Sequence, residues 1–173
     1  MNYQLIQKQK KGKNFGNGMQ WVVLLFVFFL SLPLLGVVRT YTDNGNGTIK
    51  DNGTSLVWQK CSAGQTNDAF CSGTVSAMNW QSALAYCEML SLGGREDWRL
   101  PNLKELLSLV DYTKYNPAID GTKFINTPIS AWYWSSSHGS STHVMLIDNL
   151  DGATQGWEIT GNYQVRCVAG GLN

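Results

Sequence analysis

One segment, residues 97–106, constrains the fold more than any other, because it combines a turn, an aromatic side chain and a helix start. Asn102 and Glu105 have the three-residue spacing of a helix capping box. Apolar residues then recur at the spacing of an amphipathic helix, at Leu103, Leu106, Leu107 and Val110. Pro101 disfavours a helical conformation at the residue before it. The segment therefore predicts a helix from Leu103 to about Val110 that is entered from an extended stretch.

Three other side chains have expected structural roles. Trp98 is expected in the core, as a large aromatic residue beside a helix start. Arg99 and Arg166 lie beside predicted strands or turns, so we expect each to pair with a buried carboxylate such as Glu105 or Asp97.

The remaining patterns predict an α+β fold. Asn79 can cap an earlier helix over residues 80–90, and the Asn-Gly turns within residues 41–59 predict a β-hairpin. A long irregular stretch follows the second helix, and the later strands are expected at residues 132–137, 143–148, 156–160 and 163–168, the last two as a hairpin. We expect two short helices packed on small antiparallel sheets, with residues 111–130 as a long loop region.

The N-terminal segment predicts export. Lysines precede an uncharged run, residues 21–38, that is strongly apolar through Leu30. Residues 1–38 are therefore interpreted as a signal peptide or an N-terminal membrane anchor, and residues 39–173 as one domain. The run is just long enough to span a bilayer, and the lysines before it favour export of the domain. The domain is expected in the periplasm, on the cell surface or in the medium, with membrane contact only through residues 21–38 if they are retained.

Charge narrows the class of partner. Residues 39–173 hold 9 basic and 12 acidic residues, a net charge of about −3. A mildly acidic domain argues against a nucleic-acid partner, although a local basic patch stays open.

The chain has four cysteines, which are Cys61, Cys71, Cys87 and Cys167. Four cysteines allow three different sets of disulfide pairs. Their number fits an oxidising compartment. The chain has no Cys-x-x-Cys motif, which argues against a zinc site. Cys61 and Cys71 flank a short polar loop that a bridge can close. Cys87 lies on the apolar face of the first predicted helix, and Cys167 lies in an apolar strand pattern. We expect the bridges Cys61–Cys71 and Cys87–Cys167.

Two groups of residues are candidate ligand-binding sites. Asp148, Asn149 and Asp151 form an acidic turn that, with Asp120 or Asn116 from the long loop, offers oxygen ligands for a cation such as calcium. A solvated turn is the alternative, and the identity of any metal stays unknown.

The second group is aromatic. Trp132 and Trp134 share one side of a predicted strand and Tyr133 takes the other. One side is expected to be core and the other can stack on a sugar or peptide, and Trp132 is the binding candidate of the pair.

Five stretches resemble, in the same order, the Lcl C-terminal domain family; they are residues 43–58, 83–90, 97–110, 133–137 and 165–168. That family is similar to the C-type lectin-like fold. The resemblance implies a bridge from the first helix to the last strand, which Cys87 and Cys167 fit, and a role in extracellular attachment. The chain lacks the Glu-Pro-Asn, Gln-Pro-Asp and Trp-Asn-Asp motifs of calcium-dependent lectins. No cofactor is therefore expected, although calcium stays open.

No catalytic set is apparent. Ser135, Ser136 and Ser137 lie near His138 and His143, but no Gly-x-Ser-x-Gly elbow frames the serines. The sulfatase-activating oxidases are similar to this fold, but they rely on several cysteines late in the chain. Only Cys167 lies late in this sequence, which argues against that activity.

The predicted function is therefore a non-enzymatic one. We expect an exported, disulfide-bonded binding module for a glycan or protein ligand. The alternative is a structural or assembly domain of the cell envelope.

Overall fold

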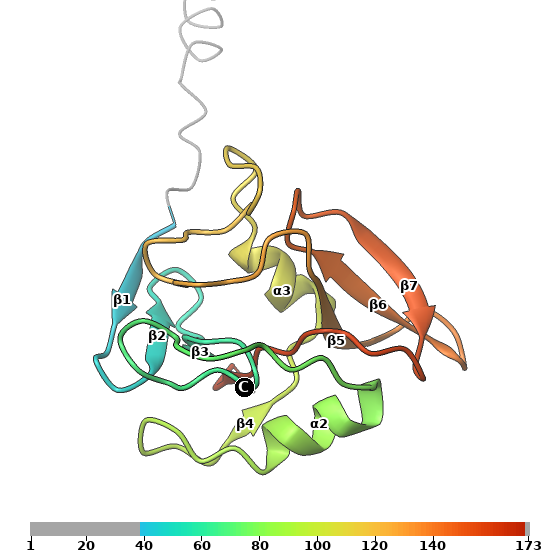
Figure 1. Cartoon of the computed structure of the whole chain (residues 1–173), viewed down its shortest axis with the longest axis horizontal. Helices are drawn as coiled ribbons and strands as arrows, with labels where there is room; N and C mark the ends of the chain where they lie inside the picture. Colours follow the sequence, from blue (N-terminus) through green and yellow to red (C-terminus); the bar gives the residue numbers. More distant parts are fainter. Residues whose placement is uncertain (1–38, 172–173) are drawn as a thin grey trace, which may run out of the picture. The chain divides into compact units, whose positions relative to one another are not determined.

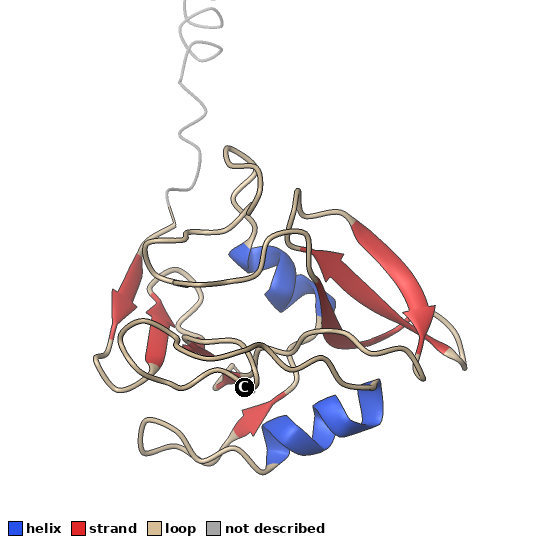
Figure 2. Ribbon diagram, viewed as in Figure 1, coloured by secondary structure: helices blue, strands red, loops and turns tan. Residues whose placement is uncertain are grey.

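Two antiparallel sheets and two short helices make up residues 39–171, the part of the chain that the computed structural model describes (Figures 1 and 2). The α+β class expected from the sequence is confirmed. The predicted signal or anchor, residues 1–38, lies outside the described residues. Within residues 39–171, no helix has the length and apolar character needed to cross a membrane.

The first sheet has the strand order β1-β2-β3-β8-β4. Its strands are β1 (Tyr41–Asp43), β2 (Thr48–Asp51), β3 (Val57–Gln59), β4 (Trp98–Arg99) and β8 (Val168–Ala169). The predicted hairpin is β2 and β3, which pair in antiparallel register from Thr48 opposite Gln59. The strand expected at residues 163–168 is shorter than predicted, because regular pairing begins at Val168, where β8 lies between β3 and β4.

The second sheet has the order β5-β6-β7, with β5 (Trp132–His138), β6 (His143–Asp148) and β7 (Thr154–Glu158). The expected last hairpin is wrong. β7 pairs with β6, and the chain then passes along β5, where Gln164 exchanges backbone hydrogen bonds with Trp132 and Trp134. It then crosses to the first sheet, where the buried residues Val168 and Ala169 pair with β3 and β4.

Both helices have the predicted caps. In α2 (Trp80–Glu88), the Asn79 side chain accepts a hydrogen bond from the amide of Ser82. In α3 (Leu103–Leu109), Asn102 and Glu105 form both arms of the capping box. α3 packs on β5 and β6, whereas α2 packs on β4 and β5.

The core has two clusters, and β5 separates them. Tyr133 points into a cluster with α3, and Trp134 points into a cluster with α2. Both faces of β5 are therefore buried at its centre, so the expectation that one face is free for binding is wrong there. Trp98 is buried in the α2 cluster, as predicted.

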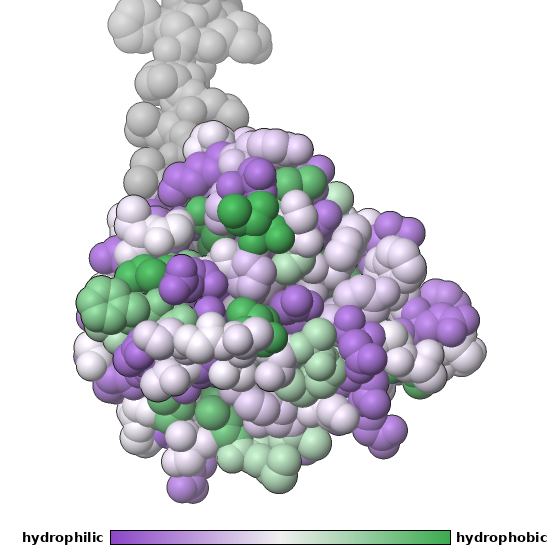
Figure 3. Space-filling view, viewed as in Figure 1, coloured by the Kyte–Doolittle hydropathy of each residue, from purple (hydrophilic) through white to green (hydrophobic). Residues whose placement is uncertain are grey.

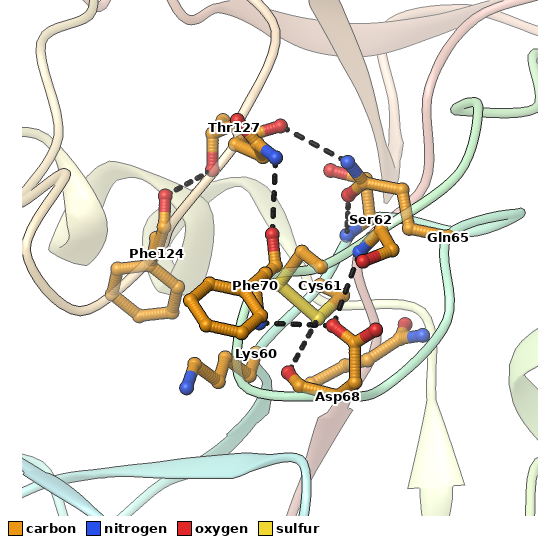
Figure 4. The surroundings of a disulfide bond; sticks show 12 residues. Lys60, Cys61, Ser62, Gln65, Asp68, Phe70, Phe124 and Thr127 are labelled. Atoms are coloured by element: carbon orange, nitrogen blue, oxygen red, sulfur yellow. Dashed lines mark hydrogen bonds between the residues drawn. A yellow bond between two sulfur atoms is a disulfide. The ribbon is translucent and has the colours of Figure 1, made fainter.

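Both expected disulfides are present. Cys87 and Cys167 join α2 to the segment before β8 across a sequence separation of 80 residues. Cys61 and Cys71 close a loop with a separation of 10 residues. Figure 4 shows how side chains within this loop, such as Gln65, bond to the long loop near Thr127.

The predicted pairing of Arg99 is confirmed, and it makes α3 sensitive to pH. The Arg99 guanidinium donates to both carboxylate oxygens of Glu105, at 2.8 and 2.6 Å. Burial alone would raise the pKa of Glu105, but hydrogen bonds from Arg99 and from the Asn102 amide outweigh burial and hold the pKa below 4.5. The pair therefore stabilises the fold above about pH 4.5 and less at lower pH.

Replacing Glu105 by glutamine is expected to lower the free energy of unfolding by about 2 kcal/mol at neutral pH, because it removes a charge-assisted hydrogen-bond pair. Urea denaturation of both proteins between pH 3 and pH 7 measures the difference. The difference should shrink below about pH 4.5, as the wild-type carboxylate becomes protonated. The control is Glu96→Gln, an exposed position. A difference that stays constant down to pH 3 would contradict the assigned role of the charge.

Candidate functional site

A half-exposed aromatic group lies on one face of the second sheet. It consists of Trp132, Trp157 and Tyr163, which we call the aromatic surface. The ring centroids of Trp132 and Trp157 are 6.1 Å apart, and those of Trp157 and Tyr163 are 5.8 Å apart. Trp157 is 36% exposed, while Trp132 and Tyr163 are half-buried. Trp157 therefore contacts both other rings, and all three are partly exposed to solvent.

Strand alternation puts these rings on the same face. Trp132 and Trp134 lie two residues apart on β5, so both point to this side of the sheet. Val144 on β6 is the register partner of Trp157 on β7 and is buried on the same face. Tyr163 enters from the chain that runs along the other edge of β5.

The surface has a buried support. Trp134 is fully buried, contacts the Tyr163 ring edge to face at 5.0 Å and donates its indole N–H to the Met78 carbonyl. A ring held in this way cannot change rotamer without breaking a buried hydrogen bond. The aromatic surface is therefore preorganised for a ligand that stacks on it.

Polar groups lie beside the rings. Asp148 is the register partner of Trp132, and Gln155, an exposed residue of β7, lies two residues from Trp157 on the same face. Carboxylates and amides at the edge of a stacking surface are hydrogen-bond acceptors for hydroxyl groups. The arrangement suits a ligand with an apolar face and a polar rim.

The long loop and the acidic turn meet beside this sheet. The Asn116 amide donates to the Leu150 carbonyl at 2.8 Å, and the Ala118 amide donates to the Asn149 carbonyl at 2.9 Å. Asn149 also donates its side chain to the Pro128 carbonyl. The structure thus brings together Asn116, Asn149 and the turn that holds Asp148 and Asp151.

The carboxylates of this region accept hydrogen bonds from groups close to them in the sequence. Asp148 accepts from the Leu150 amide, Asp151 from the Ala153 amide and Asp120 from Thr122. Burial would raise the pKa of Asp120, but the hydrogen bonds from Thr122 and the nearby Lys114 hold it below the ordinary value. Within residues 39–171, no group of three or more acidic, histidine or cysteine side chains is arranged to hold a metal ion.

The turn itself depends on a glycine. Gly152 has a φ of +82°, and a Cβ atom there would overlap Val110 at the end of α3. The Asp148 carbonyl accepts from the Gly152 amide. Because the turn packs so closely on α3, its backbone position is determined by the helix.

Arg166 corrects the sequence-based expectation of a carboxylate partner. It is buried, and no ion pair involves it among the residues that the structure describes. Its guanidinium donates to the main-chain carbonyls of Gln59 and Lys60. It also donates to the side-chain hydroxyls of Ser62 and Thr127. The guanidinium also lies 4.9 Å from the centre of the Phe124 ring. Burial lowers the pKa of this arginine.

A small cavity lies between α3, the long loop and Arg166. Its walls include Leu106, Ile119, Tyr133 and Asn149, and it has room for about one water molecule. A cavity of this size is far below the volume of a sugar or cofactor site. We therefore expect a ligand to bind on the outer surface of the domain.

The serine and histidine candidates are used in structural contacts. Ser135 donates its hydroxyl to the Met145 carbonyl, and His143 lies within hydrogen-bond reach of Ser140 and Thr142. The His138 ring packs edge to face on Trp80.

Two members of the aromatic surface, Trp157 and Tyr163, were not predicted from the sequence as site residues. Alternation along β7 puts Trp157 on the face that carries Trp132, but this inference needs the pairing of β7 with β6. The sequence analysis instead predicted that the strand containing Trp157 pairs with residues 163–168.

The comparisons with known proteins identify the family. Residues 47–169, most of the described domain, match the model of the Lcl C-terminal domain. A search of curated proteins finds no match. The matched range includes both disulfides, both helices and all three rings of the aromatic surface. The chain therefore belongs to the Lcl C-terminal domain family.

Proposed function

We propose that this chain is an exported, non-catalytic binding module of the C-type lectin-like class, and that it binds a glycan through the aromatic surface. The disulfide from α2 to the segment before β8 supports the fold class, because it joins the elements that the resemblance implies. Two disulfides in a domain of this size suit an oxidising compartment, which supports export.

One observation carries the binding proposal. Trp132, Trp157 and Tyr163 are in ring-to-ring contact and reach solvent on a supported sheet face. Aromatic rings combine a large apolar area with little loss of side-chain entropy, so they are efficient contacts for the C–H face of a sugar ring. The acceptors around them can bind its hydroxyls.

Charge selects among glycans. Asp148, the register partner of Trp132, gives the rings an acidic neighbour, and no lysine or arginine lies on β5, β6 or β7. A sulfated or uronic-acid chain would be repelled by this carboxylate and would find no cationic partner on these strands, whereas a neutral glycan would not be repelled. We therefore expect neutral glycans as ligands, bound without calcium.

Replacing Trp157 by alanine is expected to weaken glycan binding at least tenfold, because truncation of a central aromatic contact commonly costs more than about 1.4 kcal/mol. A glycan array with neutral, sialylated and sulfated members, followed by calorimetry on the best ligand, measures the effect. Trp157 is 36% exposed and contacts two rings, so its removal should also lower the unfolding midpoint, and binding is compared at a temperature well below that midpoint.

The matched control is Phe70→Ala, at a 71% exposed aromatic residue in the Cys61–Cys71 loop. Equal loss of binding in both variants, or no binding to any glycan by the wild type, would contradict the proposal. Binding of sulfated but not neutral members would refute the charge argument separately.

A structural or assembly role in the envelope is the second candidate function. It is favoured by the uncharged run at residues 21–38, which directly precedes the domain. Mass spectrometry of the mature protein tests it. An N-terminus near residue 39, with the protein free in the medium, would rule out the anchored form.

A further inference from the structure

Among the sheet edges of residues 39–171, β7 is the longest that lies open. In the first sheet, the edge strands β1 and β4 have only 3 and 2 residues. In the second sheet, the outer edge of β5 is covered, because its backbone bonds to Gln164 and Pro101. β7 has 5 residues, forms the other edge and is at least partly exposed along its whole length. Figure 1 shows it on the outer side of the second sheet, away from β5.

The backbone groups of this segment point alternately toward β6 and away from it. The Ala153 carbonyl accepts from the last amide of β6, and the Ile159 amide donates to the carbonyl that precedes β6. Hydrogen-bonded pairs alternate along an antiparallel ladder, so the odd-numbered residues of β7 bond to β6. The backbone N–H and C=O groups of Thr154, Gly156 and Glu158 therefore point outward, along the open edge.

β7 lacks the features that usually prevent pairing at an edge. Edge strands are commonly protected by lysine, proline, a bulge or a very short length. The sequence of β7 is Thr-Gln-Gly-Trp-Glu, its one charge is Glu158 at the end, and its register with β6 is continuous. Outward donors and acceptors on such an edge gain partners when another extended strand adds to the sheet.

The outward groups are self-complementary. A two-fold axis through Gly156 puts the two glycines opposite each other, where they exchange backbone hydrogen bonds and no side chain separates the strands. Thr154 then lies opposite the partner's Glu158, and the second such pair follows by symmetry. The Glu158 carbonyl already accepts from the Gly161 amide, but its own amide is directed at the partner's Thr154 carbonyl.

This register is favoured over its alternatives. An axis through Glu158 would put two carboxylates opposite each other, which is destabilising, and an axis through Thr154 would leave most of β7 unpaired. Only the axis through Gly156 pairs the whole strand without facing like charges.

The same register joins the aromatic surfaces of two copies. Residues opposite each other in an antiparallel pair point to the same face, so Trp157 lies opposite the partner's Gln155. Trp157 and the partner's Trp157 are then diagonal neighbours roughly 7–8 Å apart, within reach of large aromatic side chains. Trp157 is 36% exposed in the single chain, and the partner strand would cover part of that area.

We propose that this chain forms a two-fold symmetric homodimer through β7, in which the second sheets of both copies join into one sheet across Gly156. The occupant of the open edge is a second copy of this chain. The dimer itself does not depend on glycan binding. One consequence rests on the proposed function: a glycan long enough to span both aromatic surfaces would bind more tightly than a short one, because the second contact is intramolecular.

Cysteine trapping in the full chain tests the register. Gly156→Cys puts a thiol at the two-fold axis, where the Cα atoms of a hydrogen-bonded pair are about 5.5 Å apart, a distance that a disulfide spans. The nearest atom to a Cβ at this glycine is the Met145 sulfur at 3.6 Å, an ordinary contact. Thr154→Cys is the control, because the two copies of this exposed residue would be more than about 13 Å apart. Mild oxidation and non-reducing electrophoresis measure the linked dimer.

Charge at position 154 tests the same register without a cross-link. Thr154→Glu places a carboxylate opposite the partner's Glu158 in both symmetric pairs and is expected to weaken the dimer several-fold. Thr154→Lys places a cation there and is expected to preserve or strengthen the dimer. Thr154 is exposed, so both variants should fold. Sedimentation velocity over a concentration series measures the dissociation constants.

The expected result is a several-fold higher yield of linked dimer for Gly156→Cys than for Thr154→Cys. Equal yields, equal effects of Thr154→Glu and Thr154→Lys, or a wild type that stays monomeric at every concentration would overturn the proposal. Cross-linking of Gly156→Cys only to an added library of extended cysteine-containing peptides would assign the edge to a foreign strand and overturn it as well. Dimerisation is measured without glycan, so its failure leaves the proposed function to its own test.

Discussion

Replacing both Cys87 and Cys167 by alanine is expected to lower the free energy of unfolding by about 4.5 kcal/mol, through the entropy of the unfolded chain. The bridge closes a separation of 80 residues, so its removal releases more than half of the described domain. Both cysteines are fully buried, and alanine leaves no polar group unpaired there. Urea denaturation under non-oxidising and non-reducing conditions measures the change.

The Cys61 and Cys71 pair provides the matched control. Its separation is 10 residues, for which the same relation gives about 2.7 kcal/mol. The two double variants should therefore differ by about 2 kcal/mol. An equal loss in both, or a larger loss for the short loop, would show that native-state contacts outweigh the chain-entropy effect.

Replacing Arg166 by methionine is expected to cost about 3 to 4 kcal/mol of unfolding free energy, because buried acceptors lose their donors. Methionine fills similar space but offers no hydrogen-bond donor to the carbonyls of Gln59 and Lys60. Ser62 and Thr127 keep other partners, since Ser62 contacts the Tyr133 hydroxyl and Thr127 donates to the Phe124 carbonyl. The cost therefore arises mainly at the two carbonyls.

Arg95→Met is the control for this variant. Arg95 forms an ion pair with Asp97 on the surface, where such pairs contribute little, so a loss below about 1 kcal/mol is expected. Thermal and urea unfolding of both variants measures the difference. An Arg166→Met protein as stable as the wild type would mean that the cost of burying the guanidinium cancels its hydrogen bonds.

The position of Arg166 also explains how the loops are held. Its guanidinium joins residues 59–62, at the end of β3, to Thr127 in the long loop. The Cys61–Cys71 loop makes a second link to this region, since the Asn126 side chain donates to the Phe70 carbonyl. A long loop without regular structure is thus fixed by hydrogen bonds from two distant segments.

The exposed surface is mixed in character. Figure 3 shows the strongly apolar side chains of one face as separate patches among polar residues. The aromatic surface does not rely on a broad apolar patch. It depends on tyrosine and tryptophan rings, which combine apolar area with a polar edge.

Much of the fold was predictable because it depends on neighbouring residues. The capping pair of Asn102 and Glu105, the Asn79 cap and the Asn-Gly turns are local chemistry. Cys87 was also predictable, because helical periodicity placed it on the buried face and Cys167 lay in an apolar pattern.

The errors concern contacts between distant segments. The assumed hairpin of β7 with residues 163–168 was reasonable from alternation, but alternation does not specify which strand is the partner. Arg166 was expected to pair with a carboxylate, whereas carbonyls more than 100 residues away in the sequence accept its hydrogen bonds. Trp132 was identified as a binding candidate, but the two rings beside it were not.

The sequence alone determined the helix starts, the hairpin turns and the α+β class, because each depends on side chains within a few residues or on a repeating apolar pattern. It also predicted both disulfides, from the short loop between Cys61 and Cys71 and from the apolar patterns around Cys87 and Cys167. Tertiary structure decided which strands are neighbours, and with them the aromatic surface and the environment of Arg166. The segment at residues 97–106 marks that boundary: its helix cap can be read from the sequence, but its β4 strand pairs with β8, about 70 residues later. Local interactions are encoded by spacing, whereas pairing across the fold is selected by the whole buried core.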